Sequence, residues 1–313
     1  MSRDWAPTES SLFFKKNDPD DPRLGELVST ELRGDPSLVL AGYPDDEGIK
    51  NSGGRTGAKD APKTIRKYFY KMTPSAFAET QPRVVDVGDL TITGELEARH
   101  ERVRQRVRET LKSGHRWAGL GGGHDYGFAD GAGFLDVFGE EKPIVINFDA
   151  HLDVRPVRGA ISSGTPFNRL FAAHKSFDFA EIGIQSQCNS RKHLEWVEQK
   201  GARVVAYDRW LASGRSLTED VLATLDDWLL RPRPAYLSVD IDGFSSAHAP
   251  GCSQSFATGF DPNGFFELFD FLCARLDVRI LGLYEVSPPL DQDDRTSKLA
   301  ALILHRFLQN TAR

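Results

Sequence analysis

The sequence has few cysteines and no long apolar run, and both absences narrow the class of protein. Three cysteines stand among 313 residues and no two form a CxxC pair, so we expect a reduced cytoplasmic protein without disulfides or a zinc knuckle. No apolar run approaches the roughly 20 residues that cross a bilayer. The N-terminal stretch also has no apolar core of the kind that a secretory signal needs. We therefore expect neither a membrane protein nor a secreted one.

The sequence also lacks an excess of basic residues. Lys and Arg number 39 against 45 Asp and Glu, which gives a net charge of −6, and no stretch is polybasic. Nucleic-acid binding is therefore not expected. Hydrophobic residues make up 40% of the chain and charged residues 27%, which is typical of a globular protein with a sizeable core.

Short apolar runs rich in Val and Ile alternate with longer segments of helical period. Several runs are apolar nearly throughout, as expected for strands of a parallel sheet that helices cover on both faces. The expected strands are 38–42, 83–87, 116–120, 143–149, 179–184, 203–207, 235–240 and 280–285. The expected helices are 61–71, 95–113, 191–200, 216–231, 262–275 and 296–309. This order predicts one three-layer α/β/α domain over residues 36–313 with a mainly parallel eight-stranded sheet, after a loosely packed polar lead-in segment of residues 1–35.

Polar clusters follow four of the expected strands. They are GGGHD at 121–125, DAHLD at 149–153, DID at 240–242 and the single acid Glu285. Open α/β sheets bind their ligands at the carboxyl ends of the strands, so we expect these clusters at one functional edge of the sheet. Each motif taken alone also fits an ordinary turn or helix cap.

Together the first three clusters supply two imidazoles and four carboxylates. These side chains are His124, Asp149, His151, Asp153, Asp240 and Asp242. A hard donor set rich in oxygen with some nitrogen suits Mn²⁺ better than structural Zn²⁺, and four carboxylates balance the charge of two divalent ions. Two such ions lower the pKa of a shared water molecule, so the clusters predict metal-activated hydrolysis without a Ser or Cys nucleophile.

In this order the motifs GGGHD, DAHLD, SVDID and EVSPP resemble those of the ureohydrolases, the family of arginase, agmatinase and formimidoylglutamase. The resemblance runs from about Gly42 to the C-terminus and implies the arginase-like fold. It implies that one Mn²⁺ binds His124, Asp149, Asp153 and Asp240, and that a second binds Asp149, His151, Asp240 and Asp242. Glu285 matches the family's carboxylate that holds the planar amidine or guanidine of the substrate through parallel N–H bonds.

Several departures from arginase resemble the formimidoylglutamase branch, which cleaves N-formimidoyl-L-glutamate into L-glutamate and formamide in histidine degradation. Phe167 replaces the histidine proton shuttle of the arginase-like branch, and segment 183–188 has no acid to receive a free amine. Asp153 or a water molecule is then left to move the proton to the leaving amine. The two carboxylates of this substrate need cations or N–H donors. The candidate contacts are Arg155, Ser163, Asn51, Arg55 and Asn189.

Other interpretations stay open at this point. The same metal site would serve a hydrolase of another guanidino carboxylic acid that releases urea. A metal-binding scaffold without catalysis would also keep the ligands, whereas a single-metal zinc deacetylase would leave several carboxylates without a role. Arg55 fits a structural ion pair as well as a substrate contact, and the roles of Cys188 and Cys252 are not set. The resemblance further implies a small-molecule substrate and a homo-oligomer.

Overall fold

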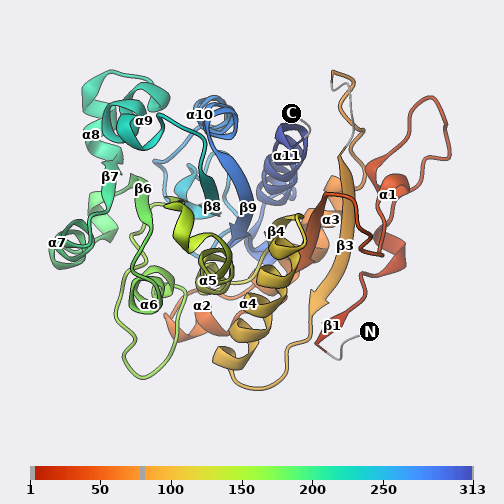
Figure 1. Cartoon of the computed structure of the whole chain (residues 1–313), viewed down its shortest axis with the longest axis horizontal. Helices are drawn as coiled ribbons and strands as arrows, with labels where there is room; N and C mark the ends of the chain where they lie inside the picture. Colours follow the sequence, from red (N-terminus) through yellow and green to blue (C-terminus); the bar gives the residue numbers. More distant parts are fainter. Residues whose placement is uncertain (1–3, 78–81, 312–313) are drawn as a thin grey trace.

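The computed structural model of the protein describes residues 4–77 and 82–311, which form a central sheet between two layers of helices (Figure 1). The strands are β1 (Trp5–Ala6), β2 (Ser37–Gly42), β3 (Arg83–Leu90), β4 (Arg116–Leu120), β5 (Ile144–Phe148), β6 (Asp178–Ile184), β7 (Arg203–Ala206), β8 (Pro234–Asp240) and β9 (Asp277–Tyr284). All eight expected strands are present, with shifts of a few residues at their ends.

The sheet has nine strands in the described residues, one more than expected, in the order β1-β3-β2-β4-β9-β8-β5-β6-β7. Every pairing is parallel except that of β1, which runs antiparallel to β3. The additional strand is β1, and its two residues are too few to show any period in the sequence. The fold class is the expected three-layer α/β/α arrangement.

The α-helices of the described residues include the six expected ones and five others. They are α1 (Leu24–Leu27), α2 (Glu47–Asn51), α3 (Ala61–Phe69), α4 (Leu96–Lys112), α5 (Tyr126–Phe138), α6 (Pro166–Ala173), α7 (Arg191–Gln199), α8 (Tyr207–Ser213), α9 (Leu217–Leu225), α10 (Pro262–Arg275) and α11 (Arg295–Asn310). Helix α5 contains three glycines and is buried along most of its length, so it has no polar stripe by which a periodic pattern is recognised. None of the helices in the described residues combines the length and the apolar composition that crossing a bilayer requires.

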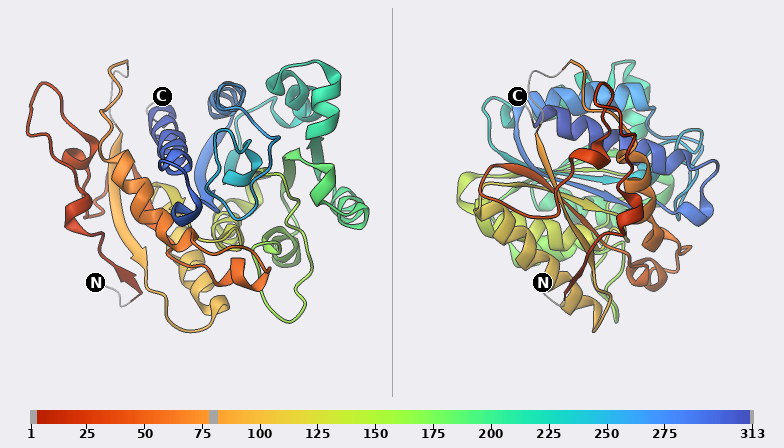
Figure 2. Two further views of the ribbon diagram at one scale, coloured as in Figure 1. Left: turned by 180° about the vertical axis from the view of Figure 1, so that it is seen from behind. Right: turned by 90° about the vertical axis from the view of Figure 1, so that its right-hand side faces the viewer.

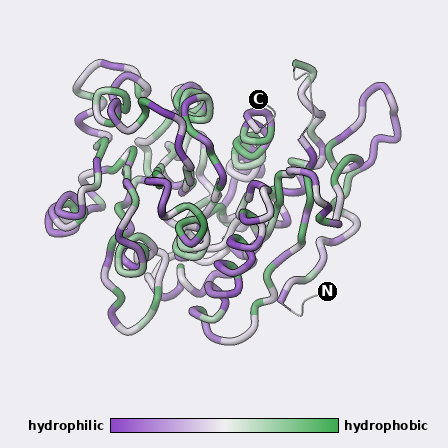
Figure 3. Tube along the Cα trace, viewed as in Figure 1, coloured by the Kyte–Doolittle hydropathy of each residue, from purple (hydrophilic) through white to green (hydrophobic). Residues whose placement is uncertain are grey.

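The core divides into two layers because successive side chains of a strand point to opposite faces. In β2, Leu38 and Leu40 belong to the same core layer as residues of α3, α10 and α11, whereas Val39 and Ala41 belong to the layer that includes residues of α4 and α5. Figure 2 shows the first group of helices on one face of the sheet, and Figure 1 shows α4, α5 and α6 on the other. Hydrophobic residues are concentrated along the strands, and hydrophilic ones lie along the outer helices (Figure 3).

The lead-in segment is mostly exposed or half-buried over the part that lies within the described residues, but a few of its residues pack on the fold. Trp5 pairs with Leu90 across β1 and β3, and its ring contacts that of Trp117 with centroids 6.2 Å apart. Leu24 is 3% exposed. These residues anchor the segment to the rest of the fold, and the loosely packed lead-in stays a prediction. Residues 1–3 lie outside the described residues, and the division at residue 36 stays a prediction.

Candidate metal and substrate site

Four adjacent strands of the sheet carry the four polar clusters at their carboxyl ends. The strands β4, β9, β8 and β5 are consecutive neighbours in the sheet. The clusters that follow them are therefore brought to one edge, although up to 161 residues separate them in sequence. This is the edge at which parallel α/β sheets bind ligands.

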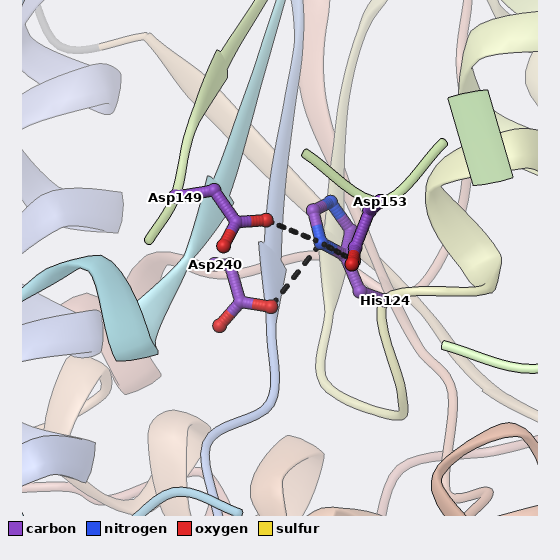
Figure 4. A group of neighbouring side chains, drawn as sticks. All are labelled: His124, Asp149, Asp153 and Asp240. Atoms are coloured by element: carbon purple, nitrogen blue, oxygen red, sulfur yellow. Dashed lines mark ion pairs between the residues drawn. The ribbon is translucent and has the colours of Figure 1, made fainter. Parts of the chain in front are cut away.

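The first group of side chains surrounds one nitrogen of His124 (Figure 4). Its Nδ1 atom lies 3.1 Å from Asp149 Oδ2, 3.0 Å from Asp153 Oδ2 and 3.2 Å from Asp240 Oδ2. Nδ1 is nevertheless buried without a hydrogen bond to any described residue. One imidazole nitrogen and three carboxylate oxygens thus converge on one point, although the nitrogen forms no hydrogen bond with them. Ligands that share a cation are arranged in this way.

The second group lies beside the first and shares Asp149 with it. His151 Nδ1 is 3.4 Å from Asp149 Oδ1 and 3.1 Å from Asp242 Oδ2. The two oxygens of Asp149 therefore face different groups, with Oδ2 toward His124 and Oδ1 toward His151. Asp240 contacts an imidazole only in the first group, through Oδ2, whereas its Oδ1 accepts a hydrogen bond of 2.9 Å from the backbone N–H of Asp242. A bridging role for Asp149 fits this arrangement, whereas the same role for Asp240 stays a prediction.

The orientation of His124 is set from its other side. His124 Nε2 lies 2.8 Å from Ser238 Oγ, a residue of β8 that is fully buried. An N–H at Nε2 that donates to Ser238 leaves the lone pair of Nδ1 directed at the three carboxylates. The imidazole stacks on the ring of Tyr284 at 4.9 Å and meets the edge of Phe167 at 5.4 Å, so both tautomer and ring position are held.

Both groups hold several carboxylates close together in a buried space. Their pKa values are therefore shifted from the usual range. Burial, together with the charges of Asp242 and Asp149, raises the pKa of Asp240 well above its usual range. Burial raises the pKa of Asp242 to about 6. Burial alone would lower the pKa of His124, but its three neighbouring carboxylates raise it well above the usual value. Divalent cations are the species that balance such a buried excess of carboxylates.

The donor set fits divalent metal ions such as Mn²⁺. The first group offers one nitrogen and three carboxylates, and the second offers one nitrogen and two carboxylates, with the ligand atoms of each group within 4.8 Å of one another. Oxygen-rich sets with imidazole suit Mn²⁺, and the absence of a cysteine ligand from these groups argues against a thiolate zinc site.

Two of the site's acids hold unusual backbone conformations. The φ angle is 46° at Asp153 and 64° at Glu285, a left-handed region that L-residues with side chains seldom adopt. Glu285 is held there by two contacts: its N–H donates to Gly122 O at 3.0 Å, and its Oε1 accepts from the His124 N–H at 3.1 Å. Strain of this kind persists only where the surrounding structure enforces it, and it is concentrated at functional sites.

A cavity of about 400 Å³ opens onto both groups. Besides His151, Asp153, Asp240, Asp242 and Glu285, its lining consists of Ser52, Gly54, Arg155, Ser163, Gly164, Gln187, Cys188, Ser253, Gln254 and Phe256. Arg155 is the one Lys or Arg in this lining, and the described residues offer it no carboxylate within ion-pair distance. Its side chain packs against the backbone of Gly164, where an added Cβ would come within 3.0 Å of it.

The structure places the five expected substrate contacts unequally. Arg155 and Ser163 line the cavity, and Ser163 Oγ lies 3.0 Å from Ser52 Oγ. Asn51 and Arg55 do not line it. Asn51 donates to Ile161 O at 2.8 Å, and the Arg55 guanidinium donates to the carbonyls of Ser253 and Cys252, both at 3.0 Å. Arg55 thus holds the 252–253 loop through backbone carbonyls, and not through the ion pair considered from the sequence.

Asn189 also lies outside the cavity lining and holds the 149–153 loop from behind. Its Nδ2 donates to Ala150 O and to Gln185 O, both at 2.8 Å, and its Oδ1 accepts from Leu152 N at 2.9 Å. These contacts position the loop that carries Asp149, His151 and Asp153. A substrate contact by Asn189 stays a prediction that this geometry does not favour.

Sequence reasoning missed Ser52, Gln187, Gln254 and Phe256, which reach the cavity from loops without a metal-ligand pattern. The one feature of the sequence that could have indicated them is that these loops follow the ends of strands and helices. The cysteines are now placed: Cys188 lines the cavity, whereas Cys252 is fully buried and burial raises the pKa of its thiol well above the usual range.

Fold and site together define an α/β protein whose sheet edge gathers His and Asp side chains suited to two divalent cations beside a polar cavity. The chain belongs to the arginase family, whose model matches residues 36–309. It is 32% identical over 320 aligned positions to the formimidoylglutamase of Aeromonas salmonicida, which covers 97% of this chain and 98% of that protein.

Solved structures agree with this assignment. The structure of Trypanosoma cruzi formiminoglutamase with two Mn²⁺ ions has a TM-score of 0.82 and 28% identity, covering 94% of this chain and 99% of that one. The formimidoylglutamase of Bacillus subtilis also has a TM-score of 0.82, at 25% identity, covering 95% of this chain and 94% of that one.

Proposed function

We propose that this chain is a binuclear manganese hydrolase that cleaves N-formimidoyl-L-glutamate with water into L-glutamate and formamide. The observation that carries the proposal is one cavity of about 400 Å³ whose lining includes members of both His and Asp groups, Glu285 and, as its one Lys or Arg, Arg155. A substrate with an amidine at one end and carboxylates at the other matches this distribution of charge. The formimidoylglutamases among its relatives support the same substrate.

The proposed metal ligands are His124, Asp149, Asp153 and Asp240 for one Mn²⁺, with Asp149, His151, Asp240 and Asp242 for the other. Bound there, the two ions supply Lewis acidity and lower the pKa of a water molecule toward neutrality. The buried imidazole nitrogen of His124, which lacks a hydrogen bond among the described residues, supports the first of these sets.

The chain's own residues bind and orient the substrate in this proposal. Glu285 Oε1 already accepts one N–H bond from the backbone of His124, which turns the carboxylate to face the cavity. Its remaining lone pairs accept parallel N–H bonds from the planar amidine. Arg155 binds a substrate carboxylate, and the Ser52 and Ser163 hydroxyls donate to the same end of the molecule.

Departure of glutamate requires a proton on its α-nitrogen. Asp153 lines the cavity and is 9% exposed, with Oδ2 facing His124. We propose that its other oxygen takes up a proton from the water molecule that is consumed and passes it to the leaving amine. Phe167 is fully buried against His124 and has no proton to give, so a histidine shuttle at that position plays no part.

Product analysis tests this function. The protein loaded with Mn²⁺ is offered N-formimidoyl-L-glutamate, arginine, agmatine and a series of short guanidinoalkanoates in separate reactions, with the Asp149→Ala variant as the control. Glutamate and formamide from the first compound alone are expected. Urea from a guanidino acid would replace the substrate and keep the site, and no turnover with two ions bound would favour a scaffold without catalysis.

The cellular setting is part of the same proposal. No disulfide joins the three cysteines within the described residues, which supports the proposal of a reducing cytoplasm. We infer a cytoplasmic enzyme of histidine degradation that acts on a small molecule and forms a homo-oligomer. Size-exclusion chromatography with light scattering measures the oligomeric state.

A further inference from the structure

A buried carboxylate that the proposed reaction does not use lies next to the metal site. Glu181 stands in the middle of β6, where it is fully buried. No Lys, Arg or His of the described residues lies within ion-pair distance of it. An ionised carboxylate in such surroundings is costly unless it is paired or receives several hydrogen bonds.

Glu181 belongs to a polar row that crosses three strands. Asn147 on β5 is the register partner of Glu181 on β6 and of Ser238 on β8. Asn147 and Ser238 stand two residues before Asp149 and Asp240, so each points to the same face of the sheet as that proposed ligand. The row therefore lies directly beneath the metal site, on the face that α5 and α6 cover.

Hydrogen bonds connect the row to the site at two places. Asn147 Nδ2 donates to Glu181 Oε2 at 2.9 Å and to Asp149 Oδ2 at 3.3 Å. Ser238 Oγ lies 2.8 Å from His124 Nε2. The oxygen of Asp149 that Asn147 contacts is the same oxygen that lies 3.1 Å from His124 Nδ1.

Counting donors shows what the row lacks. Both N–H groups of the Asn147 amide are used, one on each carboxylate. Glu181 Oε1 and Asn147 Oδ1 are both buried and have no hydrogen-bond partner among the described residues. Asn147 and Glu181 thus present two hydrogen-bond acceptors to each other, and neither side chain has an N–H or O–H left to donate. A flip of the amide would not help, because it would turn Oδ1 toward two carboxylates.

We propose that Glu181 is held as a neutral carboxylic acid whose proton satisfies Asn147 Oδ1, and that it fixes the Asp149 carboxylate for metal binding through Asn147. Glu181 is then a positioning residue, which acts through the amide and touches neither metal nor substrate. The proposal rests on the proposed metal-binding role of Asp149.

Charge balance is consistent with this assignment. The four ligand carboxylates balance two divalent cations and Glu285 is proposed to pair with the substrate's amidine, so an ionised Glu181 would be a further buried negative charge without a counter-ion. Burial raises the pKa of Glu181 well above its usual range; the hydrogen bond from Asn147 acts in the opposite direction, and the charges of Asp149 and Asp153 add to the rise. Partners of metal ligands commonly change metal affinity by about 10–100-fold when they are removed.

The test compares Glu181→Gln with Glu181→Met. Glutamine keeps a neutral hydrogen-bond donor and acceptor, so we expect the Mn²⁺ affinity of Glu181→Gln within about threefold of the wild type. Methionine keeps the volume but removes the hydrogen bonds, so we expect Glu181→Met to bind Mn²⁺ about 10–100-fold more weakly. Titration calorimetry with Mn²⁺ alone measures both. If Glu181 were ionised, Glu181→Gln would remove a negative charge and weaken binding as much as Glu181→Met, which would overturn the proposal.

Infrared difference spectra give a readout that does not depend on metal or activity. The spectrum of the Glu181→Gln variant is subtracted from that of the wild type, and the difference is expected to contain the C=O stretch of a protonated carboxylic acid. A carboxylate band in its place would overturn the proposal even if Glu181→Met failed to fold. Asp149→Ala separates the two hypotheses. Full Mn²⁺ binding by Asp149→Ala would refute the proposed function, whereas its loss together with equal effects of the two Glu181 variants would refute this inference alone.

Discussion

The sharing of Asp149 between two groups of ligands makes a quantitative prediction about metal binding and stability. Asp149 Oδ2 lies 3.1 Å from His124 Nδ1 and Oδ1 lies 3.4 Å from His151 Nδ1, whereas Asp242 faces only His151. Asp149→Ala removes a ligand from both groups and is expected to abolish both metal sites. Asp242→Ala is the matched control, since it removes a buried aspartate from one group and is expected to leave one Mn²⁺ bound.

The magnitude follows from linkage. A cation that binds only the folded state stabilises it by about 2.7 kcal/mol per site when its free concentration is 100 times Kd. Unfolding entropy of about 2.1 cal/mol/K per residue amounts to about 0.66 kcal/mol/K over 313 residues. Each occupied site should then raise Tm by about 4 °C, so that Mn²⁺ raises Tm by about 8 °C in the wild type, about 4 °C in Asp242→Ala and about 0 °C in Asp149→Ala.

Differential scanning calorimetry with and without Mn²⁺ measures these shifts, and atomic absorption on the dialysed proteins counts the ions. Both variants must first show the circular dichroism of the wild type. An Asp149→Ala protein that keeps two ions, or whose Tm rises with Mn²⁺ as much as that of the wild type, would refute the assignment of Asp149 to both sites.

Three further predictions concern other groups. Glu285→Gln should keep both Mn²⁺ ions but lose about 2–5 kcal/mol of interaction with the amidine, which corresponds to a fall in kcat/KM of at least roughly 30-fold. Unchanged kinetics would exclude Glu285 as the amidine partner. Arg155→Ala should raise KM by about 10–100-fold with a smaller effect on kcat, whereas Arg158→Ala, outside the cavity lining, should change neither; equal effects of the two would argue against carboxylate binding by Arg155. Burial raises the pKa of Asp130 from 3.8 to about 6, so the folded protein binds this proton more tightly than the unfolded chain does. The wild type should therefore gain up to about 3 kcal/mol relative to Asp130→Asn as the pH falls to about 4, and lose this gain as the pH rises past about 6; parallel pH profiles in urea unfolding would contradict the shift.

The site could be predicted from sequence to the extent that strand ends determine it. DAHLD and DID follow apolar strands, and the rule that ligands bind at the carboxyl ends of parallel strands was enough to group them. The pattern does not show which strands are neighbours, because the order β4-β9-β8-β5 depends on long crossovers. The sharing of Asp149, and the one-sided contacts of Asp240, required the side-chain geometry.

Loop residues and the interior polar groups were harder to predict for a physical reason. Arg55 is a cation near a carboxylate-binding cavity, yet its guanidinium is occupied by two backbone carbonyls that only the path of the loop brings near. Glu181 interrupts an apolar strand, and nothing in its neighbours along the chain shows that Asn147 lies opposite. Helix α5 was missed because burial on most sides removes the polar face on which helical periodicity depends.

The left-handed backbone at Asp153 and Glu285 has a consequence for attempts to engineer this protein. Glycine adopts such φ angles without the penalty of a Cβ, so replacing either acid with glycine would relieve strain of up to about 1–3 kcal/mol while removing a residue proposed for the reaction. A library selected only for heat resistance should therefore accumulate inactive variants at these two positions. Screens for a more robust protein need to hold both positions constant, because there thermal selection and turnover have opposite optima.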